Sequence, residues 1–163
     1  MRRRLLASGV LVVALAACGG EAGDADPVVP LVDEIAPAMA AVDAASGGAQ
    51  QYFEVNATPQ LVNLFVAADD AMSAIAYIYV DGELGPPAPP EPAQGATFAA
   101  AAVTFDPATI LDGDLPDADL TVFTVIGGPA GAVQYGVVAR SAEGGTLDIT
   151  LAADGSVLGV DAT

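Results

Sequence analysis

Carboxylates are almost the only ionisable side chains in this sequence that could carry out chemistry. The chain of 163 residues has 21 Asp and Glu, four Lys and Arg, one Cys and no His. The lack of histidine excludes Ser-His-Asp and Cys-His catalysis and removes the commonest ligand of protein-bound zinc. The only basic residues are Arg2, Arg3, Arg4 and Arg140, so Schiff-base and Ser-Lys chemistry are excluded as well. We therefore expect no catalytic residue, no cofactor and no enzyme activity.

The densest acidic cluster is Leu111-Asp112-Gly113-Asp114-Leu115-Pro116-Asp117-Ala118-Asp119. Carboxylate oxygens are the ligands that Ca²⁺ takes. However, Pro116 stands where a calcium loop needs its third ligand, and no glutamate closes the loop. We expect a solvated turn with helix-capping aspartates here, and no metal site. Arg140, which ends a predicted strand, is expected to be a surface partner of carboxylates, with anion binding as the alternative.

The single cysteine, Cys18, follows a segment typical of a secretory signal. Arg2-Arg3-Arg4 form a basic head, and the uncharged run from Leu5 to Ala14 comes next. This run is too short to span a hydrocarbon core of about 30 Å, which needs about 20 residues. A lone cysteine in a secreted chain cannot form an internal disulfide, so it needs another use.

Leu15-Ala16-Ala17-Cys18 resembles the lipobox of bacterial lipoproteins. The resemblance implies cleavage after Ala17, a diacylglyceryl group on the Cys18 sulfur, and location at the extracytoplasmic face of the bacterial cell membrane. Residues 1–17 are then a lipoprotein signal peptide, and residues 18–26 are a lipidated tether. Export by the general route or by a twin-arginine route stays open, because Arg2-Arg3-Arg4-Leu5-Leu6 loosely fits the latter.

The mature chain that this predicts is strongly acidic. After removal of residues 1–17 it keeps all 21 carboxylates and only Arg140, a formal charge of −20. Nucleic-acid binding needs Lys and Arg to displace counterions from phosphates, so we expect no nucleic-acid partner. Electrostatic docking on anionic lipid headgroups is excluded for the same reason. The expected partners are the membrane, through the lipid anchor, and a protein or other component of the envelope.

The elements that position these residues begin with a predicted helix. Asp26-Pro27 is a helix-start signal, and Gly47-Gly48 should end the helix. Pro37 should kink it, because proline lacks an N–H and crowds the preceding turn. An apolar stripe at helical spacing predicts the buried face, and its members are Val28, Leu31, Ile35, Met39 and Val42.

Strands are predicted where β-branched and aromatic residues are enriched between turn signals. In the first half, residues 27–84, they cover 51–55, 61–66 and 74–80. Residues 85–92 are rich in proline and predict a linker or loop. The second half, residues 93–163, has a predicted short helix from Asp106 to Asp112. Its predicted strands cover 121–126, 133–139, 146–151 and 156–160, with a hairpin at Asp154-Gly155.

The two halves match in part when the chain is shifted by 83 residues. Tyr52 then meets Tyr135, Val55 meets Val138, Leu64 meets Leu147 and Val66 meets Ile149. The fold class expected is α+β, a helix followed by an antiparallel β-meander, with duplication as two halves left open. In layout alone, this resembles PepSY-type and β-lactamase-inhibitor-type secreted modules, and no motif of those families is matched.

Tyr77 and Tyr79 share one face of a strand whose two faces are both apolar. We expect them to be buried, with a partner surface as the alternative. The function expected is that of a membrane-anchored extracytoplasmic lipoprotein with a non-enzymatic binding or envelope-associated role. Two alternatives stay open, a carboxylate-dependent hydrolase of the cell envelope and an apolar-ligand carrier. Buried paired carboxylates in a cleft would favour the first, and a large dry cavity would favour the second.

Overall fold

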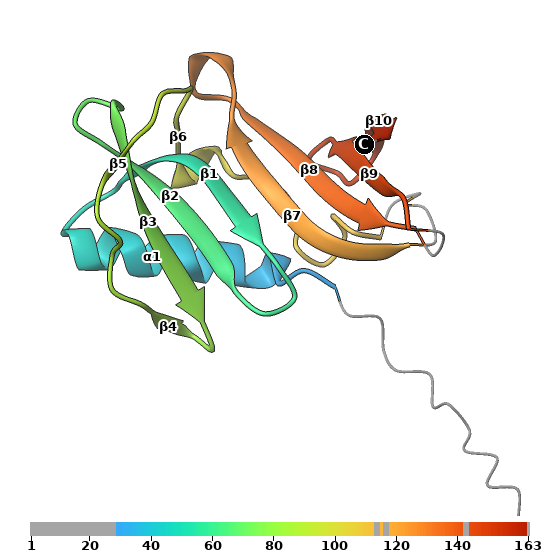
Figure 1. The fold of residues 1–163 in the computed structure, drawn as a ribbon, viewed down its shortest axis with the longest axis horizontal. Helices are drawn as coiled ribbons and strands as arrows, with labels where there is room; N and C mark the ends of the chain where they lie inside the picture. The colour runs from blue at the N-terminus through green and yellow to red at the C-terminus, as the bar shows by residue number, and fades with distance from the viewer. Residues whose placement is uncertain (1–28, 113–114, 116–117, 142–143, 163) are drawn as a thin grey trace, which may run out of the picture.

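The computed structural model describes residues 29–112, 115, 118–141 and 144–162. Its helical elements are η1 (Val32–Glu34), α1 (Ile35–Ser46), η2 (Ala100–Ala102) and η3 (Pro129–Gly131). Its strands are β1 (Gln51–Ala57), β2 (Val62–Ala68), β3 (Ser73–Val80), β4 (Glu83–Leu84), β5 (Glu91–Pro92), β6 (Phe98–Ala99), β7 (Asp119–Gly127), β8 (Val133–Arg140), β9 (Thr146–Leu151) and β10 (Val157–Ala162). One α-helix followed by an antiparallel sheet confirms the α+β class with a β-meander (Figure 1).

Helix α1 begins later than predicted, and this changes the role of Pro37. The helix-start signal Asp26-Pro27 lies outside the described residues, and α1 starts at Ile35 after the short turn η1. Pro37 therefore falls in the first turn of α1, where a backbone N–H has no partner within the helix. The predicted kink is wrong for this reason. Gly47 ends α1 in the left-handed conformation (φ 75°), as the glycine pair predicts.

The sheet is continuous across both halves of the chain. Its main strand order is β10-β9-β8-β7-β1-β2-β3-β4, so two meanders run outward from a central antiparallel pair, β1 and β7. In that pair Val55 lies opposite Val125, and Ala57 lies opposite Phe123. All four of these side chains are buried. The two halves therefore meet through backbone pairing and a common core.

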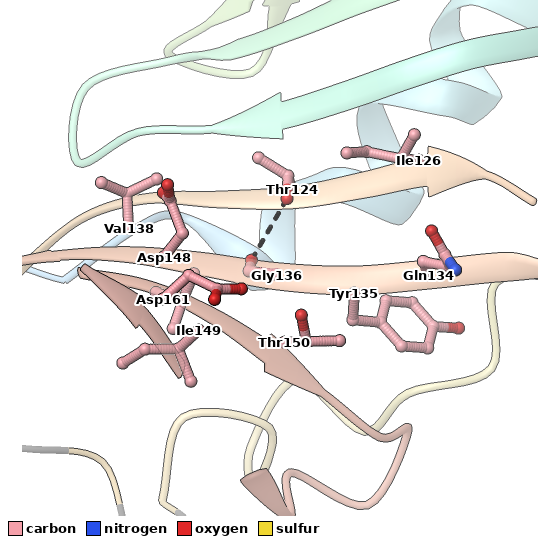
Figure 2. A pocket seen from close by; sticks show the side chains of 11 residues that line it. Thr124, Ile126, Gln134, Tyr135, Gly136, Val138, Asp148, Ile149, Thr150 and Asp161 are labelled. Carbon is pink, nitrogen blue, oxygen red and sulfur yellow. Dashed lines mark hydrogen bonds between the residues drawn. The ribbon is translucent and has the colours of Figure 1, made fainter. Parts of the chain in front are cut away.

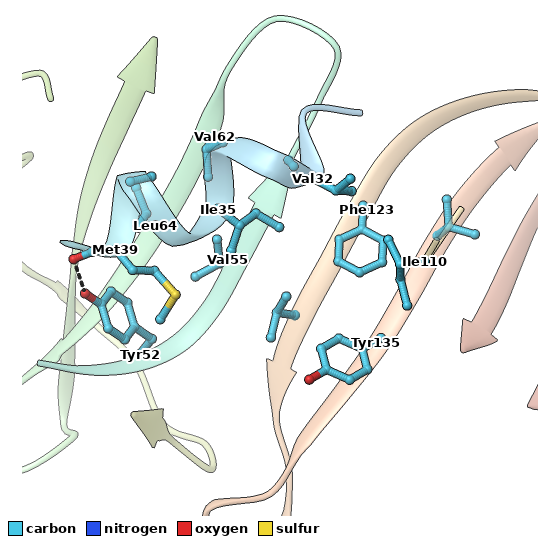
Figure 3. Packing of buried hydrophobic residues seen from close by; sticks show 14 of the residues in the cluster. Val32, Ile35, Met39, Tyr52, Val55, Val62, Leu64, Ile110, Phe123 and Tyr135 are labelled. Atoms are coloured by element: carbon cyan, nitrogen blue, oxygen red, sulfur yellow. Dashed lines mark hydrogen bonds between the residues drawn. The ribbon is translucent and has the colours of Figure 1, made fainter. Parts of the chain in front are cut away.

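The core of the first half lies between α1 and the sheet. The apolar face of α1 is buried on β1 and β2, and Figure 3 shows Ile35 and Met39 over Val55, Val62 and Leu64. Among the predicted stripe, Ile35, Met39 and Val42 are buried and Leu31 is half-buried, while Val28 lies outside the described residues.

The second half has no helix of its own at Asp106–Asp112. This segment forms turns, with the carbonyl of Asp106 accepting the N–H groups of Thr109 and Ile110. The prediction of a short helix is wrong, because Ile110 leaves the turn to pack, fully buried, under the sheet. Phe105 lies beside it, with its ring 5.1 Å from that of Phe123 and 5.4 Å from that of Tyr135. An irregular segment thus covers the second half where a helix was expected.

The proline-rich residues 85–92 run along the outer edge of β3. The backbone N–H of Gly85 donates to the Ile78 carbonyl, and that of Ala88 donates to the Ala76 carbonyl. The short strand β5 then pairs with the start of β3. Proline within a sheet is tolerated at an edge, because an edge strand needs no donor on its outer side. This segment therefore closes one edge of the sheet.

The 83-residue shift is matched only in part by the structure. Tyr52 and Tyr135 are both buried on the face that α1 covers, and so are Val66 and Ile149. However, the residues that lie 83 positions after those of α1 form the strand β7 and not a helix. The second helix that a duplication and the layout resemblance both require is therefore missing from the described part of the chain. In that part, no helix is long and apolar enough to cross a membrane.

Candidate binding face

Within the described residues, one face of the sheet carries no helix. Helix α1 lies on one side of β1–β3, and the residues that alternate with the buried ones point to the other side. We call this other side the open face. Its most exposed apolar side chains are Ile78, Val80 and Ile126, which are 47%, 40% and 42% exposed. The open face is therefore apolar over β3 and at the end of β7.

A hollow of about 330 Å³ lies in the open face over β7–β10. Its floor is Gly136, where a Cβ atom would come within 2.9 Å of the Thr124 hydroxyl oxygen. Figure 2 shows Ile126 and Gln134 at one end and Asp148 and Asp161 at the other. One end of the hollow thus combines an apolar and an uncharged polar side chain, and the other end is acidic. A side chain at position 136 would therefore require Thr124 to shift.

A second hollow, of about 370 Å³, adjoins the first and shares Ile126 with it. Phe53 and Phe65 line it, and residues 93–96 form its wall. Gly127 permits this wall to approach, because a Cβ atom there would lie only 2.2 Å from the Ala96 carbonyl oxygen. Together the two hollows form a trough across the open face. No feature of the strand sequences alone indicated this trough, because it depends on which strands are neighbours.

The centre of the open face holds an unpaired polar atom. Asn56 lies between Asn63 of β2 and Thr124 of β7 in the strand register. Its Oδ1 atom is buried and accepts no hydrogen bond from the described residues. A buried acceptor without a donor costs about 1–3 kcal/mol. The open face therefore retains a polar atom at a stability cost.

The two carboxylates at the acidic end of the trough are exposed, and Glu54, which lines the second hollow, is half-buried. Asp148 and Asp161 lie directly opposite each other on β9 and β10, and both are solvent-exposed. A hydrolytic pair needs one carboxyl group whose pKa is raised, usually by burial. In the described part of the chain no Asp or Glu is buried. The geometry at Asp148 and Asp161 therefore gives no support to the hydrolase alternative.

A third hollow, of about 270 Å³, lies on the other side of the molecule between α1 and residues 100–107. Ile35, Met39, Val103 and Phe105 make it mostly apolar, and Asp43 lies at its margin. Pockets that bind ligands of drug size are usually about 300–1,000 Å³. This hollow is therefore small for the apolar-ligand carrier that the sequence left open.

Comparison with known proteins gives no match. No family model, no curated protein and no solved structure is significantly similar to this chain. The residues of the trough and its chemistry are therefore the basis for any functional conclusion.

Several of the residues singled out from the sequence lie outside the described part of the structure. Cys18, together with the rest of the signal and tether, lies outside the described residues, as do Gly113, Asp114, Pro116 and Asp117 of the acidic cluster. In the described ranges, no group of three or more Asp, Glu, Cys or His is placed to hold a metal ion.

Arg140 is exposed at the end of β8, and the register places it opposite Asp119 on β7. The register brings opposite charges onto neighbouring strands, and the role of Arg140 as a surface partner of carboxylates stays a prediction. Tyr79 is buried, at 8% exposure, and Tyr77 is partly buried against the same core. Both point to the side of the sheet that α1 covers. Ile78 and Val80 point to the open face and are therefore exposed.

Proposed function

We propose that this chain is a lipid-anchored extracytoplasmic binding protein that is held at Cys18 and binds an envelope partner through the open face. The observation that carries the binding role is the exposure of Ile78, Val80 and Ile126 on the sheet face opposite α1. Exposed apolar side chains on an uncovered sheet face mark a candidate interaction surface.

The anchor is supported by the sequence Leu15-Ala16-Ala17-Cys18 and its basic, apolar leader. A lipid anchor removes the need for affinity between the domain and the membrane surface. The charge of −20 on the mature chain repels it from anionic lipids, so the tether of residues 18–26 would hold it off the surface. An envelope protein that projects from the membrane on such a tether is suited to meeting partners.

Site-specific photocrosslinking in intact cells tests the binding role. A photoreactive amino acid at Ile126 should give a discrete crosslinked product, because Ile126 joins the two hollows of the trough. The matched control is the same amino acid at Ala40, which is exposed on α1 away from the open face. A product from Ile126 but not from Ala40 supports the proposal. Equal products from both positions, or none from Ile126, would contradict it.

A further inference from the structure

The two outer edges of the sheet differ in their protection. The edge at β3 is covered by β4 and by the proline-rich residues 85–92. The edge at β10 is bare, because among the described residues Val157–Ala162 pair only with β9. Natural proteins protect exposed edge strands with proline, charge, bulges or covering segments, because a bare edge pairs with other strands. The β3 edge has proline and a covering segment, whereas β10 has a bulge between Val157 and Gly159 and the charge of Asp161 but no covering segment among the described residues.

The bare edge carries exposed apolar side chains. Leu158 is 67% exposed and Val160 is 53% exposed. Val160 lies opposite Ile149 of β9, which lies opposite Val137 of β8, and both of these are buried. This row of apolar residues is thus buried across two strands and ends on an exposed valine. One further strand beside β10 would extend the row and cover Val160.

The other face of the same edge is acidic. Asp161 lies opposite Asp148, and both are exposed at the acidic end of the trough. Like charges directly opposite each other on a sheet are destabilising, whereas opposite charges across neighbouring strands are stabilising. A strand added beside β10 would place a residue next to Asp161. A Lys or Arg at that position would relieve the repulsion.

We propose that β10 binds an extended basic segment of another protein by strand addition, in which apolar residues alternate with Lys or Arg. The apolar residues extend the row of Val160, and the basic residues face Asp161 and Asp148 on the open face. A second copy of this chain fits less well, because it brings a further large negative charge. This inference rests on the proposed binding function and names the chemistry of its partner.

Short synthetic peptides test the proposal on the lipidated full chain in detergent. The probe is a peptide of alternating Val and Lys. It should bind and slow backbone hydrogen exchange at residues 157–162. The same peptide N-methylated along one edge keeps its charge and its sequence but cannot form the strand hydrogen bonds, so it should bind about tenfold more weakly. An alternating Val and Glu peptide should not bind.

Two variants complete the test. Val160→Lys should abolish binding of the Val and Lys peptide, because it introduces a repelling charge into the apolar row. Met72→Lys is the control, because Met72 is 59% exposed but lies between β2 and β3, away from β10. Equal binding of the N-methylated peptide, or equal loss in both variants, would show mere charge attraction and overturn the proposal. Protection of β10 without peptide, together with dimer formation, would show self-pairing and also overturn it.

The failure of this inference is distinguishable from failure of the proposed function. If no peptide binds while Ile126 still gives its crosslinked product in cells, the open face binds a partner of other chemistry and the strand-addition proposal is wrong. If Ile126 gives no product but the Val and Lys peptide binds as described, strand addition at β10 is supported and the proposed binding through the open face is wrong.

Discussion

The hydroxyl of Tyr52 donates a hydrogen bond to Oδ1 of Asp43 at 2.8 Å, and this contact ties β1 to the last turn of α1. The ring of Tyr52 is fully buried. The same Asp43 oxygen accepts the backbone N–H of Gln50 at 3.0 Å, just before β1 begins. Burial, followed by the hydrogen bond and negative charge of Asp43, raises the pKa of Tyr52 above its ordinary value of 10.0.

This contact predicts a loss of stability in alkaline solution. The folded state holds the Tyr52 proton more tightly than the unfolded state, so this contribution is complete below pH 10 and declines as the pH rises above it. Tyr52→Phe should lower the free energy of unfolding at neutral pH by about 1–2 kcal/mol and flatten the alkaline decline. Urea melts across this pH range measure both effects. Tyr79→Phe is the control, because Tyr79 is also buried but is not among the groups that raise the pKa of Tyr52. An equally flattened decline in that variant would contradict the assignment.

Asn56→Val should stabilise the protein. The substitution removes the buried Oδ1 atom that has no donor and places a β-branched residue in a central strand, with an expected gain of about 1 kcal/mol. Asn63→Val, on the neighbouring strand directly opposite, is the matched control for strand propensity alone. Denaturant midpoints should rise more for Asn56→Val than for Asn63→Val. Equal shifts would mean that the unpaired oxygen costs nothing.

The two glycines of the trough should differ in their tolerance of alanine. Gly127→Ala meets backbone atoms of Ala96 at 2.2 Å, so it should destabilise by about 3 kcal/mol or more and open the wall of the second hollow. In Gly136→Ala the one tight contact is with the Thr124 hydroxyl oxygen at 2.9 Å, while the Ile149 carbonyl oxygen lies at an ordinary 3.5 Å. Its smaller cost should therefore be relieved in a Gly136→Ala and Thr124→Ala double variant. Gly48→Ala, with open space around its Cβ, is the control. Thermal melts that rank the three variants otherwise would contradict this packing.

Side-chain truncations on the two faces of β3 should differ in their effect on the free energy of unfolding. Tyr79→Ala should lower the free energy of unfolding by about 3–5 kcal/mol, because Tyr79 is 8% exposed under α1. Ile78→Ala should cost well under half as much, because Ile78 is 47% exposed on the open face. Denaturant midpoints with unchanged slopes are the measurement. A large loss for Ile78→Ala would show that the open face is covered in solution.

The seven longer strands were predictable from the sequence because each is marked locally, whereas the two-residue strands β4, β5 and β6 were not predicted. Thr146–Leu151 alternates apolar and polar residues, and the structure has β9 over those same residues. The hairpin at Asp154-Gly155 forms as expected, with Gly155 at φ 83° and the Ser156 hydroxyl and N–H bound to Asp154 Oδ1. Such signals depend on a few neighbouring residues, so they can be recognised in a single sequence without knowledge of the tertiary contacts.

The arrangement of the strands was not predictable in the same way. The capping signal at Asp106 is present, since its carboxylate accepts the Ala108 N–H. The burial of Ile110 nevertheless overrides that local preference and stops the segment after its turns. The pairing of β1 with β7 and the bare edge at β10 depend on partners distant in sequence. The trough exists only because of that pairing, which explains why residue patterns did not reveal it.

The intact mass of the protein purified from membranes tests the central claim most directly, since the open face can meet an envelope partner only if the chain is exported and anchored. The account predicts a chain that begins at Cys18 and carries a diacylglyceryl group on its sulfur. It also predicts that Cys18→Ala leaves an unprocessed precursor without lipid. A mature chain that begins elsewhere with no lipid, or a Cys18→Ala variant that is processed and still partitions into the detergent phase, would contradict the account.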